Sequence, residues 1–88
     1  MPIISAFFGI IIRMYFKDTE QHHTPHFHAK YNEFEASFDL SGNLLAGDFP
    51  VKQGKYVAVW ADIHREELAA LWEIMQSGED YYKIKGLE

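Results

Sequence analysis

The chain has 88 residues without a cysteine, 48% of them hydrophobic and 16% aromatic, and its net charge is −5. These values predict a single domain over residues 1–88 and exclude disulfide frameworks and thiolate metal sites. The acidic balance and the lack of a basic cluster argue against direct nucleic-acid binding and favour a basic protein surface as partner.

The N-terminal segment predicts a strand rather than a targeting or membrane-spanning element. The apolar run from Ile3 to Ile12 has about half the length of a membrane span, and no basic n-region precedes it. We therefore expect a cytoplasmic protein without a membrane contact. From Phe7 to Phe16, apolar side chains occupy every second position, which is typical of a β-strand.

A β-hairpin is predicted after a polar loop. Apolar and polar residues alternate over residues 26–32 and 34–40, with Asn32 and Glu33 between them as a two-residue turn. This register places apolar residues opposite one another, whereas a slip by one residue would destroy the match. On the polar face, the register predicts the cross-strand pairs His26–Asp39, His28–Ser37 and Lys30–Glu35.

The remaining elements predict an α+β fold. Gly42-Asn43 indicates a second hairpin, whose return strand Leu44–Phe49 turns Leu45, Gly47 and Phe49 toward the apolar face. Apolar residues spaced three or four apart predict one long amphipathic helix over residues 53–77, which stops at Gly78. Gly54 is a poor interior helix residue, so a start just after it is the alternative. Residues 81–85 alternate weakly and add at most a short edge strand. We expect a small antiparallel sheet of three to five strands, a β-meander, covered by this helix.

One histidine lies within the apolar stripe of the predicted helix. His64 falls between Trp60 and Leu68. We expect its imidazole to be half-buried and hydrogen-bonded to the backbone or to Glu67. Trp60 and Trp72 are expected to share a core role.

The order of these motifs resembles a bacterial family of unknown function, DUF4160, over nearly the whole chain. The resemblance rests on Ile3–Ser5, Phe8–Ile10, Ile12–Phe16, Pro25–Ala29, Tyr31, Glu35-Ala36, Trp60, His64–Leu68 and Trp72. It implies a short prokaryotic protein encoded beside another small protein, as a component of a toxin–antitoxin-like pair, and it implies no activity. His22 matches a histidine that usually precedes a Pro-Pro-His-Phe-His run in the family. His23-Thr24 departs from that run, which puts a role for His23 in doubt.

Four of the five histidines lie between His22 and His28, and strand parity divides them. His26 and His28 are expected to point to one face, about 6–7 Å apart, so that their ring nitrogens can converge on one zinc ion. The third ligand would be His22 from the loop or Asp39 across the strand. Asp39 could instead accept a hydrogen bond that orients His26. Zinc, held by His22, His26 and His28, is the cofactor that this pattern suggests.

A metal-free catalytic site is the second hypothesis. Histidine titrates near neutral pH, and Arg13 would face the same patch if its strand neighbours the hairpin. Arg13 would then stabilise phosphate charge, His26 and His28 would move protons, and Asp39 would orient a histidine. The activity would be that of a small metal-assisted or ribonuclease-like hydrolase.

A polar sheet face without chemistry is the third hypothesis. The histidines would then hydrogen-bond to Ser37 and Asp39 and contact a partner protein. The function that we predict from the sequence is a protein-interaction component of a toxin–antitoxin-like pair, which binds a partner encoded nearby through a free sheet edge. The hydrolase is the alternative, and a homo-oligomer is a further option for the assembly.

Overall fold

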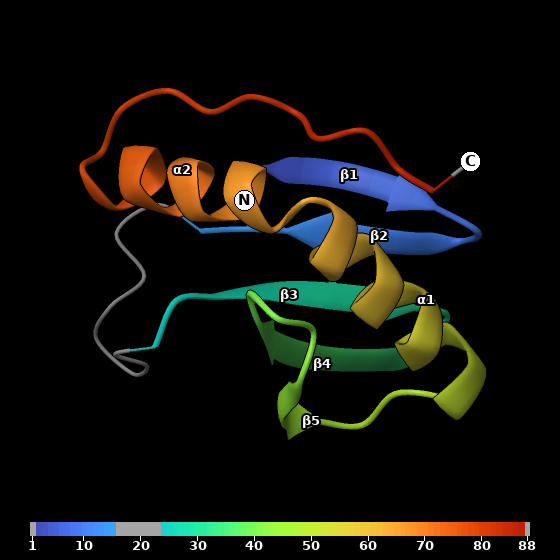
Figure 1. Ribbon diagram of the computed structural model, residues 1–88. Coiled ribbons are helices and arrows are strands. Elements are labelled where there is room, and N and C mark those ends of the chain that lie inside the picture. The colour runs from blue at the N-terminus through green and yellow to red at the C-terminus, as the bar shows by residue number, and fades with distance from the viewer. Residues whose placement is uncertain (1, 16–23, 88) are drawn as a thin grey trace.

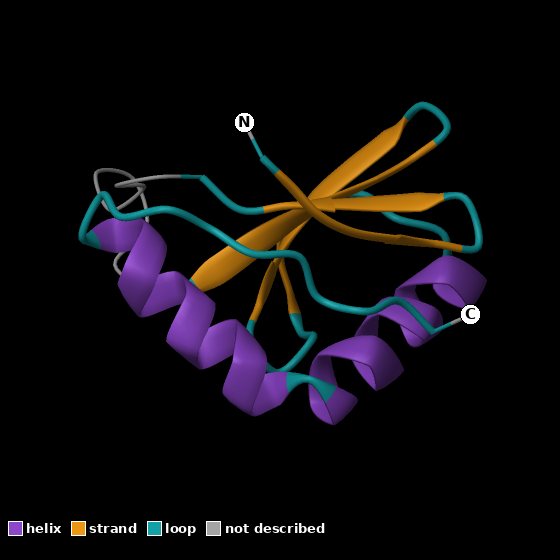
Figure 2. Ribbon diagram, turned by 90° about the horizontal axis from the view of Figure 1, so that it is seen from above, coloured by secondary structure: helices purple, strands orange, loops and turns teal. Residues whose placement is uncertain are grey.

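The computed structural model describes residues 2–15 and 24–87, which form one sheet and two helices (Figure 1). The elements are β1 (Ile3–Phe7), β2 (Ile10–Arg13), β3 (His26–Tyr31), β4 (Phe34–Asp39), β5 (Leu44–Gly47), α1 (Val51–Ile63) and α2 (Arg65–Gln76). The strands pair antiparallel in the order β1-β2-β3-β4-β5. Both helices lie on the same side of this sheet (Figure 2). The predicted α+β class and the meander are confirmed.

The N-terminal region forms a hairpin where the sequence predicts one strand over Phe7–Phe16. Phe8 and Gly9 have φ angles of 50° and 79°, so the chain turns back between β1 and β2. Positive φ at both central residues is the mark of a tight hairpin turn. Alternation did not reveal this turn because apolar residues continue through it, and phenylalanine rarely adopts positive φ.

The β3–β4 hairpin has the predicted register at every position. The pairs run from His26 with Asp39 to Tyr31 with Phe34. Asn32 lies in the turn with a φ of 52°, a conformation that asparagine tolerates better than most residues. This hairpin therefore fixes which polar side chains lie beside one another.

The prediction of a single long helix is wrong, because α1 and α2 are separate. At His64, φ is −107° and ψ is 25°, outside the helical range, and its N–H donates to the Trp60 carbonyl (3.0 Å). Its carbonyl then accepts from the Leu68 N–H (2.9 Å), so α2 starts directly. The three-to-four spacing of apolar residues runs through this break and therefore could not indicate it.

The helical region ends where the sequence predicts but begins earlier. Gly54 lies in the first turn of α1, where its N–H donates to the Pro50 carbonyl (2.8 Å), so the helix begins before Gly54 rather than after it. Gly78 has a φ of 85° and follows α2, as predicted for a stop residue.

The C-terminal segment is extended but forms no strand, so the short edge strand that the sequence allowed over residues 81–85 is absent. Figure 1 shows it, in red, passing along α2 and β1. The Ile84 N–H donates to the Ile4 carbonyl of β1 (2.7 Å), and the Lys85 carbonyl accepts from Trp60 Nε1 (2.9 Å). A Cβ on Gly86 would lie 2.7 Å from the Ala6 carbonyl oxygen. The segment therefore lies close against the β1 side of the sheet.

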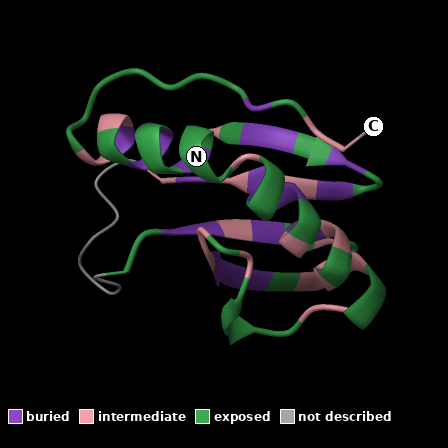
Figure 3. Cartoon of the chain, viewed as in Figure 1, coloured by how far each residue is buried: buried purple, intermediate pink, exposed green. Residues whose placement is uncertain are grey.

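Trp60 occupies the centre of the core between the sheet and the helices. It is fully buried, and its ring centroid lies 5.4 Å from that of Phe7 and 5.5 Å from that of Phe27. Figure 3 shows the buried stretches on the strands and on the inner sides of the helices. Trp72 is also buried, as expected. Neither described helix is long and apolar enough to cross a membrane.

Strand β5 departs from the predicted return strand Leu44–Phe49. It ends at Gly47, and all four of its residues are exposed, although Leu45 and Gly47 were expected on the apolar face. The pairing with β4 shifts between Ser37 and Phe38, which breaks the alternation on which the expectation rested. Phe49 does pack against the core, as predicted, with its ring 5.5 Å from Phe38.

Candidate functional site on the polar face of the sheet

Three polar side chains come from three neighbouring strands. Arg13 of β2 is the cross-strand partner of His28 of β3, and His28 is the partner of Ser37 of β4. The strand that carries Arg13 therefore neighbours the hairpin, which was the condition for placing Arg13 beside the histidines. The helices cover the other side of the sheet, toward the viewer in Figure 1.

A pocket of about 60 Å³ opens at this place. Its lining residues are Arg13, Tyr15, His28, Ala29, Lys30, Glu35 and Ala36. The Tyr15 ring meets the His28 ring edge-on, with centroids 4.5 Å apart. Lys30 Nζ lies 3.5 Å from a Glu35 carboxylate oxygen, and both side chains are well exposed. The pocket thus combines two cations, one carboxylate, a phenol and an imidazole.

His26 is held more firmly than a surface histidine. It is 1% exposed, and its ring centroid lies 5.1 Å from that of His28 and 5.2 Å from that of Trp72. Its Nδ1 is 2.9 Å from the Thr24 carbonyl oxygen. Because a carbonyl only accepts, Nδ1 is the donor, and in the neutral ring the lone pair is on Nε2. Contact with Trp72, which the strand pattern did not indicate, adds α2 to the elements that position this histidine.

Asp39 lies opposite His26 in register, but its described hydrogen bonds go to the next turn. One carboxylate oxygen accepts from the N–H groups of Ser41 (2.9 Å) and Asn43 (3.0 Å), and the other from Asn43 Nδ2 (3.2 Å). Asp39 therefore fixes the β4–β5 turn. Its predicted role in orienting a histidine stays a prediction.

The predicted zinc site has two of its three ligands in the part of the chain that the structure describes. His26 and His28 are adjacent there, whereas His22 and His23 lie outside the described residues. Over residues 2–15 and 24–87, no group of three or more histidine, aspartate or glutamate side chains is placed to hold a metal ion. The zinc hypothesis stays a prediction.

His64 belongs to the helix junction rather than to the sheet face. Its Nδ1 is 2.5 Å from a Glu67 carboxylate oxygen, the partner expected from the sequence, and its ring lies 5.8 Å from that of Trp60. A wide, open hollow of about 400 Å³ adjoins this junction and is lined by Asp62, Ile63, Arg65, Glu66 and Glu67. Sequence reasoning could not find this hollow because it depends on the helix break.

The pocket adds a charged residue, Lys30, that the site hypotheses did not include. Lys30 was placed opposite Glu35 by the predicted register but was not assigned to the site. The sequence alone could have assigned Lys30 to the site, since Lys30 is two residues from His28 and therefore lies on the same face of the strand. The register and Arg13 together would have indicated a cationic pocket.

Comparisons with known proteins give one match. The model of a family described as a domain of unknown function, DUF4160, matches residues 9–73. This range includes β2 to β5, α1 and most of α2, and so all the described site residues. No curated protein and no solved structure matches the chain.

Proposed function

The chain belongs to the DUF4160 family, a domain of unknown function, and we propose that it is the protein-interaction component of a toxin–antitoxin-like pair. Its partner, encoded nearby, contributes an extended segment that pairs with β5 and continues the sheet. Such strand addition obtains affinity from backbone hydrogen bonds and specificity from alternate side chains. The observation that carries the proposal is the exposed, uncharged edge formed by β5.

The two edges of the sheet differ in a way that supports β5 as the contact. On the β1 side, the C-terminal segment lies close enough for the Ile84 N–H to donate to Ile4. On the other side, β5 is Leu-Leu-Ala-Gly, with four exposed residues and neither a charge nor a proline. Natural edge strands usually carry charges, prolines or a cover that prevents pairing with another chain. Strand β5 is short and its pairing with β4 is irregular, which are partial protections, but it has none of these side-chain protections.

The chemistry around β5 indicates what its partner strand would carry. Leu44 is 52% exposed and Leu45 is 41% exposed, so apolar side chains on the partner would find contacts there. Exposed Asp48 follows the strand, and Asp39 lies at the start of the turn that precedes it. The chain as a whole has a net charge of −5. An apolar segment flanked by lysine or arginine is therefore the complementary partner.

Replacing Leu44 by lysine is expected to break the pair. A lysine on an edge strand opposes addition of a further strand and removes an apolar contact. We expect the amount of co-expressed neighbour protein that co-purifies with the chain to fall about tenfold or more, corresponding to roughly 1.4 kcal/mol. The measurement is co-purification of the two tagged proteins after co-expression.

Val59→Lys is the matched control, because Val59 is also 52% exposed but belongs to α1 and not to the edge strand. It should leave co-purification unchanged. Equal losses from both variants, or a soluble wild-type chain that never co-purifies with its neighbour, would refute pairing through β5. Growth of the expressing cells gives a second readout. Whichever member is toxic, a broken pair releases it. Co-expression of the pair carrying Leu44→Lys should therefore arrest growth, and co-expression of the wild-type pair should not.

A hydrolase centred on the polar face is the second candidate function. The contact between the rings of His26 and His28, with Arg13 across from His28, supports it. In this proposal the histidines move protons and Arg13 stabilises phosphate charge. If the chain is such an enzyme, its expression alone is toxic and His28→Ala removes the toxicity while the fold persists. Equal toxicity from the wild type and from His28→Ala would eliminate the hydrolase.

A further inference from the structure

The pocket contains an arginine, Arg13, that has no acidic partner among the described residues. Arg13 is partly buried on β2, and no carboxylate of residues 2–15 and 24–87 forms a salt bridge with it. Burial of a guanidinium removes hydration free energy, and without a partner no interaction compensates for this loss. Buried arginine side chains are therefore usually paired with an anion. The position is notable on an acidic chain, in which thirteen carboxylates stand against eight basic residues.

The other lining groups suit an anion as well. Lys30 supplies a second cation, and Tyr15 and His28 can each donate a hydrogen bond. Among the described lining residues, Glu35 is the one carboxylate. It is the more exposed member of its pair with Lys30, at 72% of the side chain, so its charge is screened by water. Two cations against one carboxylate give the described part of the lining a positive charge.

We propose that this pocket, formed by Arg13, Tyr15, His28 and Lys30, binds a phosphate group. A phosphate carries about −1.5 to −2 charges at neutral pH and so matches two cations better than a carboxylate does. The planar guanidinium binds two phosphate oxygens at once. A volume of about 60 Å³ accepts one tetrahedral oxyanion, so the rest of a phosphate ester would lie outside the pocket.

The proposal deepens the hydrolase candidate by naming its ligand class, but it requires only binding. It does not involve β5, which contributes no lining residue. Leu44→Lys should therefore bind phosphate as the wild type does. If the chain binds phosphate but its expression is not toxic, the pocket is a binding site and the hydrolase is eliminated.

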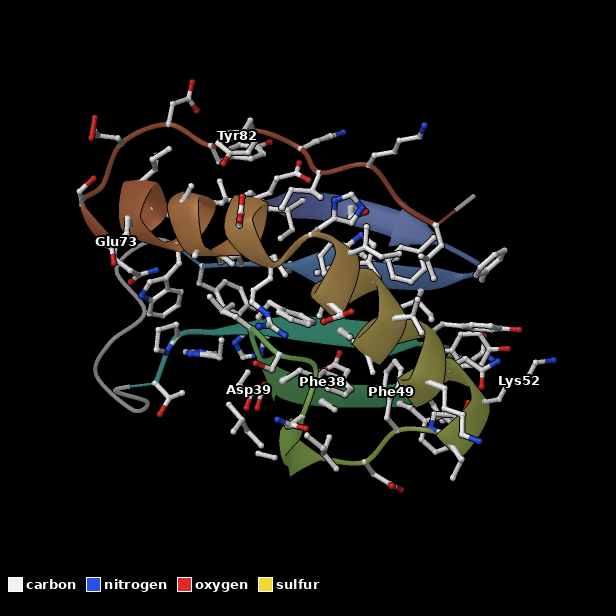
Figure 4. All side chains as sticks on the ribbon, in the orientation of Figure 1. Phe38, Asp39, Phe49, Lys52, Glu73 and Tyr82 are labelled. Atoms are coloured by element: carbon white, nitrogen blue, oxygen red, sulfur yellow. The ribbon has the colours of Figure 1, made fainter. Side chains whose placement is uncertain are left out.

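The test is calorimetric titration of the full chain with inorganic phosphate, with adenosine monophosphate and with acetate. We expect both phosphates to bind more tightly than acetate, and Arg13→Gln to weaken both by about tenfold or more. Tighter binding of the nucleotide would identify a phosphate ester as the natural source, and equal binding would identify free phosphate. Lys52→Gln is the control, since Lys52 lies in the first turn of α1 (Figure 4), on the helix side of the sheet, and does not line the pocket.

A second variant keeps the test valid if Arg13→Gln fails to fold. Glu35→Gln removes the negative charge from an exposed side chain and frees Lys30, so phosphate should bind roughly two- to fivefold more tightly. Circular dichroism reports the fold of each variant. The proposal is overturned if phosphate gives no Arg13-dependent signal, if Glu35→Gln weakens binding, or if Lys52→Gln weakens it as much as Arg13→Gln does.

Discussion

Replacing Trp60 by alanine is expected to lower the free energy of unfolding by about 3–5 kcal/mol, the range found for large-to-small changes of buried aromatic residues. Trp60 is fully buried and contacts the rings of Phe7 and Phe27, which belong to two different strands. Its Nε1 also donates to the Lys85 carbonyl, which ties the C-terminal segment to the core. The free energy of unfolding of a small domain is about 5–15 kcal/mol, so this one substitution removes a large part of it. Urea unfolding followed by circular dichroism measures the loss.

Two controls separate the contributions of Trp60. Trp60→Phe keeps an aromatic ring but removes the hydrogen bond to Lys85, and should cost less than Trp60→Ala. Val59→Ala changes the neighbouring, exposed residue and should stay within about 0.5 kcal/mol of the wild type. A Trp60→Ala protein as stable as the Val59→Ala protein would contradict the described core.

Replacing Gly47 by alanine is expected to destabilise the chain by roughly 2–4 kcal/mol, because both its backbone conformation and its surroundings exclude a side chain. Gly47 has a φ of 90°, and a Cβ there would overlap the Glu35 carbonyl oxygen and lie 2.8 Å from the Ala36 Cα. Backbone atoms cannot move aside as a flexible side chain can. The end of β5 would have to separate from β4.

The same substitution at Gly54 should have the opposite sign. Apart from its chain neighbours and the backbone of its own helix, no atom lies within 4 Å of the position of its Cβ, and the residue is helical. Alanine there should raise stability by about 0.5–1 kcal/mol, since glycine is a poor helix former. Thermal unfolding of the two variants measures both effects. A rise in stability for Gly47→Ala, or equal changes at both glycines, would contradict the described β4–β5 contact.

The β3–β4 hairpin shows how far the sequence alone can go. Its register followed from two facts: side chains alternate across a strand, and the turn has two residues. Every pair from His26–Asp39 to Tyr31–Phe34 is then determined, and the structure has all of them. Local patterns sufficed because both strands and the turn are contiguous in the chain.

Three features needed information that local patterns do not carry. The turn at Phe8 and the break at His64 both interrupt an apolar pattern that continues through them. The shift in the β4–β5 pairing turned Leu45 outward, although alternation placed it inward. In each case the packing of distant elements overrides the local preference.

In the candidate site, too, the contacts between strands could be predicted from the sequence, whereas the contacts with a helix or a loop could not. Strand pairing placed Arg13 next to His28, as the sequence suggested, because both lie in regular strands. The contact of His26 with Trp72 and the capping of the β4–β5 turn by Asp39 involve a helix and a loop. Strand parity says nothing about either. Of the predicted site residues, the pocket therefore includes Arg13 and His28 but not His26 or Asp39.

Hydrogen–deuterium exchange on the purified pair examines the proposed interaction at its point of contact. If the partner adds a strand to the sheet, the amides of residues 44–47 exchange more slowly in the complex than in the isolated chain, because edge amides become hydrogen-bonded. The outer face of α1 around Val59 should exchange equally in both. Unchanged exchange over residues 44–47 in a complex that protects another surface would contradict the assignment of β5 as the binding edge.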